Sequence, residues 1–440
     1  MKLVKLSLIA AMATGIMATT ASATPLDEVI KDVDASGMLR VRYTHDSEKG
    51  ADKKKDGESN WNFKGVLNLK TKIDDNFFAV AGIRYTDTDK SETESGNDRR
   101  GDRFDLNRAY LGYTIGNTVV QVGRQDVGAF FTDDMYGDGI KVLNSDIEGL
   151  TLAALWMDAL ENDSDIGTLA KIKDLYDAED LFKNPGTTIS PADQAAILNA
   201  NAIKLATGKS VTDHNLYGVA ALGSYDPVSF QVWYAMLEDV TDLFAVELAF
   251  SFDVSDDVNI NAKLQYGFSD FDGKFKKDVK DATMALTKAG NPQDPEPAIE
   301  IGDADFYGAE LGTELYGVDL TAGYVNFSTD SDKVSLVSFE DSGSYIKPGE
   351  ELFDYTLFAG KNDYWFVTAG YTIPDTAVRI GADYLDGKNK FAGEKTKMKE
   401  AVARLEYAHS DKLKFQTWYS HVKEGDEKND RVRFEAKYSF

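Results

Sequence analysis

The chain has 440 residues, no cysteine, and 48 basic against 74 acidic side chains, which gives a formal net charge of −26. The absence of cysteine excludes disulfide bonds, thiolate metal sites and cysteine nucleophiles. The acidic surplus argues against nucleic acid as a partner, because binding to phosphate relies on Lys and Arg. It favours cations.

The first 23 residues have the pattern of a cleaved export signal. Lys2 and Lys5 precede a short apolar run, and Ala21-Ser22-Ala23 follows it as a cleavage site. The run is shorter than the ~20 residues that span a bilayer. We therefore expect a signal peptide over 1–23 and a mature chain over 24–440, whose formal charge is −28 once the two lysines are removed. The acidic, strand-poor stretch 25–34 predicts a short periplasmic or lumen-plugging segment before a first strand near Met38.

Alternation of apolar and polar residues over segments of roughly ten residues recurs along the mature chain, as in a sheet between lipid and water. At the C-terminus the apolar positions are Val432, Phe434, Ala436, Tyr438 and Phe440. The same pattern returns over 61–70, 244–250, 260–266, 378–384, 403–407 and 413–419. It predicts an all-β protein, a transmembrane antiparallel β-barrel.

Short turn signals alternate with long hydrophilic stretches. Turns rich in Asp, Asn, Gly or Pro lie at 74–76, 116–117, 144–149, 225–227, 255–257, 316–317, 374–375 and 410–411. The long stretches are 45–58, 87–102, 161–214, 270–303 and 329–354. Short turns at one end and long extracellular loops at the other are typical of bacterial barrels, and eight short turns imply about 18 strands.

Residues 161–214 depart from the strand pattern. Ser190-Pro191 fits a helix start and Gly208 a helix end, so a helix is expected over 192–207, with a second over 165–182. We interpret the stretch as one oversized, partly helical loop inserted in the barrel. A small inserted helical domain is the alternative.

Charges divide across the expected lumen. The early strands place basic residues on the polar face, namely Arg40, Arg42, Lys64, Lys70, Lys72, Arg84 and Arg108. The third long-side connection, 126–138, carries Asp126, Asp133, Asp134 and Asp138. If this connection folds inward, the basic wall of the barrel and the acidic loop face each other across a pore constriction. Fixed charges at a constriction set ion selectivity. The alternative is that these charges are only the solvated face of a sheet.

Carboxylates also suggest a metal. Asp133, Asp134, Asp138 and Asp158 are expected near the same constriction, and calcium is the natural ion for oxygen ligands. Against this, surface repulsion and solubility explain most Asp-rich runs. The four histidines lie in loops or at strand ends without metal-ligand spacing, and we predict no catalytic residue, no required cofactor and no enzymatic activity.

Several segments resemble the major outer-membrane porin family of Campylobacter. They are MKLVKLSLIAAM at the start, TPLDEVIKDVDASGMLRVRY from Thr24, residues 144–154, VRIGADY and EAVARLEY. The resemblance implies an 18-stranded, homotrimeric, cation-preferring porin of the bacterial outer membrane, often called an antigen and adhesin, with calcium at the constriction. The acids of that family correspond to Asp133 and Asp158, the expected calcium ligands; its third acidic position has no clear counterpart here.

The predicted function is therefore passive diffusion of ions and small hydrophilic solutes through a water-filled channel surrounded by outer-membrane lipids. A substrate-specific porin, which would carry an aromatic or arginine ladder in its lumen, is one alternative. A surface adhesin or antigen acting through its extracellular loops is another, and single-channel conductance would separate it from a porin.

Overall fold

A computed structural model describes residues 33–49, 55–90, 104–132, 135–161, 208, 213–255, 258–290, 300–330, 332–339, 344–354 and 356–440. Three of the predictions lie outside these ranges. They concern the signal peptide over 1–23, the helices over 165–182 and 192–207, and the side chains of Asp133 and Asp134.

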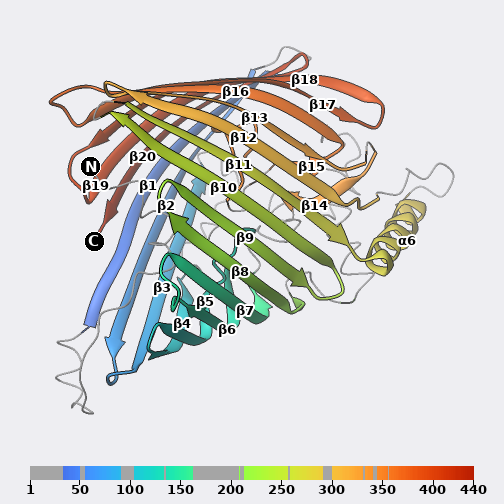
Figure 1. The fold of residues 1–440 in the computed structure, drawn as a ribbon. Coiled ribbons are helices and arrows are strands. Elements are labelled where there is room, and N and C mark those ends of the chain that lie inside the picture. Colours follow the sequence, from blue (N-terminus) through green and yellow to red (C-terminus); the bar gives the residue numbers. More distant parts are fainter. Residues whose placement is uncertain are drawn as a thin grey trace.

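Eighteen strands form one antiparallel sheet that closes on itself, as predicted (Figure 1). They are β1 (Val33–Lys49), β2 (Lys55–Lys72), β3 (Phe77–Lys90), β4 (Phe104–Ile115), β5 (Thr118–Asp126), β6 (Tyr136–Asn144), β7 (Leu150–Leu160), β8 (Leu216–Tyr225), β9 (Val228–Leu237), β10 (Thr241–Ser255), β11 (Val258–Phe271), β12 (Ala304–Leu315), β13 (Val318–Ser328), β16 (Lys361–Thr372), β17 (Val378–Phe391), β18 (Glu394–Ala408), β19 (Leu413–Glu424) and β20 (Glu427–Ser439). Closure comes from the pairing of β1 with β20, which runs from Met38 opposite Ser439 to Lys49 opposite Lys428. The closed sheet has no free edge, so every strand finds hydrogen-bond partners on both sides.

The predicted turns are confirmed where the structure describes them; residues 256–257, in one of the eight, lie outside the described residues. Each joins two neighbouring strands at one end of the barrel, beginning with 73–76 between β2 and β3 and finishing with 409–412 between β18 and β19. The turn at Tyr316-Gly317 shows why these residues suit it: both have positive φ, 51° and 81°, as tight hairpins require. The connections at the other end, which include all the longest ones, lie opposite, so the barrel has a short-turn end and a long-loop end.

Side chains alternate between the two faces of the wall. On β20, Val432, Phe434 and Tyr438 are exposed on the outside, while Arg431 and Arg433 occupy the inside. The outer face exposes large apolar side chains all around the sheet, from Leu39 on β1 to Phe440. This surface is the kind that hydrocarbon covers in a membrane barrel.

Tyrosines border this apolar surface towards the long-loop end. Four of them donate a hydrogen bond to an aspartate of a neighbouring strand: Tyr234 to Asp242, Tyr266 to Asp305, Tyr324 to Asp363 and Tyr419 to Asp430. Tyrosine rings with one wet end are characteristic of the membrane–water interface.

Two sequence predictions at the start of the chain are corrected. Strand β1 begins at Val33 rather than near Met38, and it continues to Lys49. The stretch 45–58 is mostly not a loop, because β1 and β2 pair in register up to Lys49 and Lys55. Its Asp, Ser and Glu residues resemble a loop in composition, although the backbone continues the ladder.

A helix, α6 (Gly273–Gly290), occupies much of the 270–303 stretch that we expected to be only a hydrophilic loop. Asp272 caps it by accepting hydrogen bonds from the backbone N–H groups of Lys274 and Phe275. Phe275 and Val279, one turn apart, are buried and hold the helix at the long-loop end (Figure 1). Among the residues described, no helix is long and apolar enough to cross a membrane.

The connection between β13 and β16 contains a small second sheet, β14 (Val334–Ser338) with β15 (Leu357–Ala359). An aromatic cluster fixes it to the wall; its members are Phe306, Phe327, Phe339, Phe353, Phe358 and Tyr364, each at most 2% exposed. Phe339 and Phe353 stack with ring centroids 4.7 Å apart, and Phe327 lies edge-on to Phe339 at 4.8 Å. This packing makes the connection a rigid part of the barrel interior.

Candidate functional site

The inner wall of β1 to β4 carries a row of basic side chains, as predicted. Exposed Leu39, Phe63 and Ile83 mark the outer face, and their neighbours Arg40, Lys64 and Arg84 therefore face the lumen. The same alternation places Arg42, Lys70, Lys72 and Arg108 inside.

Most of these cations have acidic or polar partners. Arg42 binds Glu435 at 2.8 Å, and Arg40 donates to the side chain of Asn62 at 3.0 Å. Arg84 pairs with Glu161, and Arg108 pairs with Asp126 at 2.7 Å.

Arg84 and Arg108 converge on one aromatic ring. Their guanidinium groups lie 5.4 and 5.8 Å from the centre of the Tyr136 ring, within cation–π range. The Tyr136 hydroxyl accepts a hydrogen bond from Asn107. The structure thus brings together Arg84, Arg108 and Asp126, the basic and acidic sides of the predicted charge division.

Of the predicted acidic residues, the structure describes Asp126, Asp138 and Asp158, and these three do not form a single group. Asp126 and Asp138 end β5 and begin β6 rather than lying in a loop, and Asp138 pairs with Arg124 at 3.3 Å. Asp158 is exposed, and the pairing of β6 with β7 shifts register at this residue, because Gly139 lies opposite Met157 while Asp138 lies opposite Ala159. Such a bulge interrupts the alternation of side chains, so the position of Asp158 at the constriction stays a prediction. No group of three or more His, Asp or Glu side chains in the described ranges is placed to hold a metal ion.

The connection between β5 and β6 packs inward. Val127, Phe130 and Met135 are at most 1% exposed, and the Phe130 ring lies edge-on to Tyr345 with centroids 5.0 Å apart. The Phe130 carbonyl accepts a hydrogen bond from the Ser344 backbone N–H. The β5–β6 connection thus contacts a segment of the β13–β16 connection that lies inside the barrel.

That segment, residues 344–354, is here called the inner segment. At its start, the Gln265 side chain on β11 donates to the Ser344 carbonyl at 2.9 Å and accepts from the Ile346 N–H at 2.7 Å. At its end, Asp354 lies 3.6 Å from Arg431 on β20. Because it touches wall strands from β11 to β20, the inner segment occupies part of the lumen.

Glu400 on β18 is the main anchor of the inner segment. Its side chain is completely buried, and its carboxylate accepts backbone N–H groups of Glu350, Glu351 and Leu352 at 3.0, 2.9 and 3.1 Å. The Ser420 hydroxyl donates a fourth hydrogen bond at 2.7 Å. A buried carboxylate is tolerated only with such partners, so this contact requires the segment to be docked.

Gly349 is required for this approach. Its φ is +80°, and a Cβ there would lie 2.3 Å from Glu400 Oε2. Any larger residue would be strained and would push the carboxylate away.

Two arginines complete the anchorage. Arg404 binds Glu350 at 2.7 Å and Asp383 at 2.6 Å, and Arg431 binds Asp46 and lies 3.7 Å from Glu351. Burial raises the pKa of Glu351 to about 7, although Arg431 acts in the opposite direction; Asp46, Glu400 and Asp354 add repulsion. Burial also raises the pKa of Glu350.

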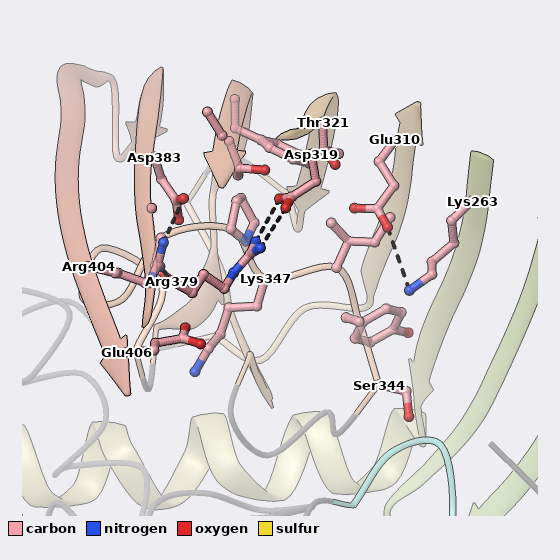
Figure 2. A pocket seen from close by; sticks show the side chains of 18 residues that line it. Lys263, Glu310, Asp319, Thr321, Ser344, Lys347, Arg379, Asp383, Arg404 and Glu406 are labelled. Carbon is pink, nitrogen blue, oxygen red and sulfur yellow. Dashed lines mark hydrogen bonds and ion pairs between the residues drawn. The ribbon is translucent and has the colours of Figure 1, made fainter. Parts of the chain in front are cut away.

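Between the inner segment and the wall lies a pocket of about 460 Å³, here called the wall pocket (Figure 2). It is lined by β11 to β13 and β16 to β18 and by residues 344–349. Its charged members are Lys263, Glu310, Asp319, Lys347, Arg379, Asp383, Arg404 and Glu406. Figure 2 shows the Arg379 side chain directed at Asp319, and Arg404 at Asp383.

Sequence reasoning did not find the inner segment or the wall pocket. The stretch 329–354 was interpreted as an extracellular loop because of its acidic and Ser-rich composition. The signal for an interior position was present in its apolar residues, Val334, Leu336, Phe339, Ile346 and Phe353, all of which are buried.

The four histidines show no shared site. His45 hydrogen-bonds to Ser59 at 2.7 Å and His421 to Asp430 at 2.7 Å, while His409 contacts Tyr407. His214 is buried.

A family model described as the Campylobacter major outer membrane protein matches residues 1–440, the whole chain. No curated protein matches. Solved structures that are similar to this chain include three outer-membrane barrels. OccK5 (OpdH) of Pseudomonas aeruginosa is 14% identical with a TM-score of 0.62, and the match covers 93% of this chain and 98% of that one. OprD of the same organism is 14% identical with a TM-score of 0.61, and the match covers 97% of this chain and 98% of that one. A BenF-like porin of Pseudomonas fluorescens Pf-5 is 14% identical with a TM-score of 0.62, and the match covers 93% of this chain and 99% of that one.

At these identities the structural neighbours support the fold, which is that of outer-membrane porins. The full-length family match agrees with the likeness in residues that the sequence showed. The chain therefore belongs to the Campylobacter major outer membrane protein family and is a protein of the bacterial outer membrane.

Proposed function

We propose that this protein is a passive diffusion channel for ions and small hydrophilic solutes, without enzymatic activity. Family and fold indicate an outer-membrane porin channel. The observation that carries the finer proposal is the closed wall of 18 strands, apolar outside and charged inside. Water and solutes would cross along the charged face while hydrocarbon covers the other.

Selectivity would arise where the lumen is narrowest. The inner segment and the β5–β6 connection meet inside the barrel through Phe130 and Ser344. The basic row from Arg40 to Arg108 lies on the wall of β1 to β4. Solutes would pass between fixed charges of both signs, which filter by charge and size.

We propose a preference for cations because the chain as a whole carries a net charge of −26. Such a field concentrates cations at both mouths. The basic row opposes this effect locally, and its ion pairs with Glu435, Asp126 and Glu161 reduce the opposition.

Calcium at the constriction stays a proposal, with Asp133 and Asp158 as its ligands and with Asp134 or Asp138 as the alternatives to Asp133. Asp158 is an exposed residue at the bulge of β7. Calcium binding to the purified protein, compared with its Asp133→Asn variant, would test this. The homotrimer implied by the family is likewise proposed, and cross-linking of the detergent-solubilised protein would test it.

The channel is tested by swelling of liposomes that contain the purified protein. Neutral sugars should enter at rates that fall with size, as expected of a water-filled pore. Rates equal to those of protein-free liposomes would refute diffusion. In the same preparation, a reversal potential across a KCl gradient with the sign of potassium permeation would support cation preference, and the opposite sign would refute it.

A further inference from the structure

The wall pocket lies in the solute path. Its wall residues occupy the half of their strands nearest the short turns, such as Asp319 near the start of β13 and Glu406 near the end of β18. Residues 344–349 of the inner segment cover it from the long-loop side (Figure 2). A solute that has passed the inner segment would reach this pocket next, an inference that depends on the proposed diffusion function.

Its charges balance. Lys263, Lys347, Arg379 and Arg404 are opposed by Glu310, Asp319, Asp383 and Glu406. A simple anion near one of the arginines would meet a neighbouring carboxylate, and a simple cation would meet a neighbouring arginine or lysine. Neither gains a net field from this lining.

The ion pairs of the pocket are of two kinds. Arg404 and Asp383 have side chains only 17% and 6% exposed, and Arg404 also binds Glu350 of the inner segment, so this pair belongs to the anchorage. Arg379 and Asp319, joined by two hydrogen bonds of 2.6 and 2.7 Å, are 37% and 39% exposed. Lys263 and Glu310 are 3.6 Å apart and also partly exposed. Exposed pairs are weak, so a solute that supplies both charges can exchange with them.

The rest of the lining offers an apolar surface and free space. Tyr345, Ile346, Pro348 and Phe366 border the pocket. Gly381 faces it from β17, and a Cβ there would make only ordinary contacts, 3.4 Å from the Ala369 carbonyl and 3.8 Å from Arg404. The volume of about 460 Å³ lies within the range of small-ligand pockets.

We propose that the wall pocket is a binding subsite for small zwitterions, namely α-amino acids and short peptides with free termini. The solute carboxylate binds Arg379 or Lys263, and its ammonium group binds Asp319, Glu310 or Glu406. Both charges of the solute replace both members of an exposed pair, so no charge of the pocket is left without a partner. An uncharged side chain lies against the Tyr345 and Phe366 side.

The test uses single-channel recordings in a planar bilayer with glycylphenylalanine as the probe. The dipeptide should interrupt the current in a concentration-dependent manner. Its N-acetylated and C-terminally amidated form, which keeps the peptide bond and the phenyl ring but carries no charge, should not do so. Equal interruption by both forms would overturn the proposal.

Two variants locate the effect. The double change Arg379→Gln with Asp319→Asn removes an exposed pair without leaving an unpaired charge, and it should raise the apparent dissociation constant of the dipeptide by at least about tenfold. Gly381→Leu should fill the pocket and abolish the interruptions. The control is Lys274→Gln with Asp278→Asn, an ion pair on α6 that does not line the pocket, and it should bind the dipeptide as the unaltered protein does.

The outcomes separate this inference from the proposed function. Normal conductance steps with no dipeptide interruption, or interruptions unchanged in the Arg379 and Gly381 variants, would overturn the subsite and leave the channel in place. Absence of any conductance step in the unaltered protein would instead refute the channel itself.

Discussion

The Glu400→Gln substitution tests whether the inner segment is held by a single buried carboxylate. Glutamine keeps the volume and one oxygen, which can still accept from Glu350 and Glu351. The amide NH₂ of glutamine replaces the carboxylate oxygen that accepts from the Leu352 N–H. This buried N–H then has no acceptor and lies against a second donor, the NH₂ group. A hydrogen bond to a charged group contributes about 1.5–3 kcal/mol. We therefore expect docking to weaken by about 2–4 kcal/mol, which raises the ratio of detached to docked segments by roughly 30- to 700-fold.

The assay is single-channel conductance together with limited proteolysis. A detached inner segment leaves more of the lumen open and exposes its backbone, so the variant should show larger or noisier open-channel current and faster cleavage within 344–354. Glu394→Gln, an exposed position at the start of the same strand, is the control and should change neither. If the Glu400 variant folds and its current and cleavage match the unaltered protein, the anchorage described here is wrong.

Three further results are expected. In the docked segment the pKa of Glu351 is raised from 4.5 to about 7, so docking should strengthen as the pH falls through this window and the carboxyl group takes up a proton. Open-channel noise should therefore decline from pH ~8 to ~5, and Glu351→Gln should remove most of this pH dependence. Noise that grows on acidification would contradict the reasoning. Gly349→Ala should resemble Glu400→Gln in its noise, because its Cβ would collide with that carboxylate at a positive φ; an unchanged current would show that the contact is dispensable. Replacing Arg84 and Arg108 by Gln should shift the reversal potential towards stronger cation preference, since two positive charges leave the inner wall; a shift in the opposite direction would show that the face of these residues is assigned wrongly.

The barrel itself was predictable from the sequence because its physical requirement is periodic. One face of each strand must contact hydrocarbon and the other must line the lumen. Val432, Phe434 and Tyr438 therefore alternate with Arg431 and Arg433, independently of which residues lie on the neighbouring strands. Turns need residues that tolerate unusual backbone angles, and these residues mark all eight short turns. The number of turns then fixed the number of strands.

The interior was much less predictable, because it depends on contacts between distant residues. Glu400 and Leu352 meet across 48 positions, and nothing near Glu400 in the sequence distinguishes it from a solvated strand residue. Helix α6 is hard to predict because the hydrophilic composition of 270–303 is that of a loop, and only the spacing of Phe275 and Val279 indicates a helix.

The central claim is that one chain closes into a cylinder through which water and ions pass. Single-channel recording from the purified protein in a planar lipid bilayer tests this most directly. Insertion should give discrete, uniform current steps that scale linearly with voltage and rise with salt concentration. A folded, membrane-inserted protein that gives no steps would contradict the claim.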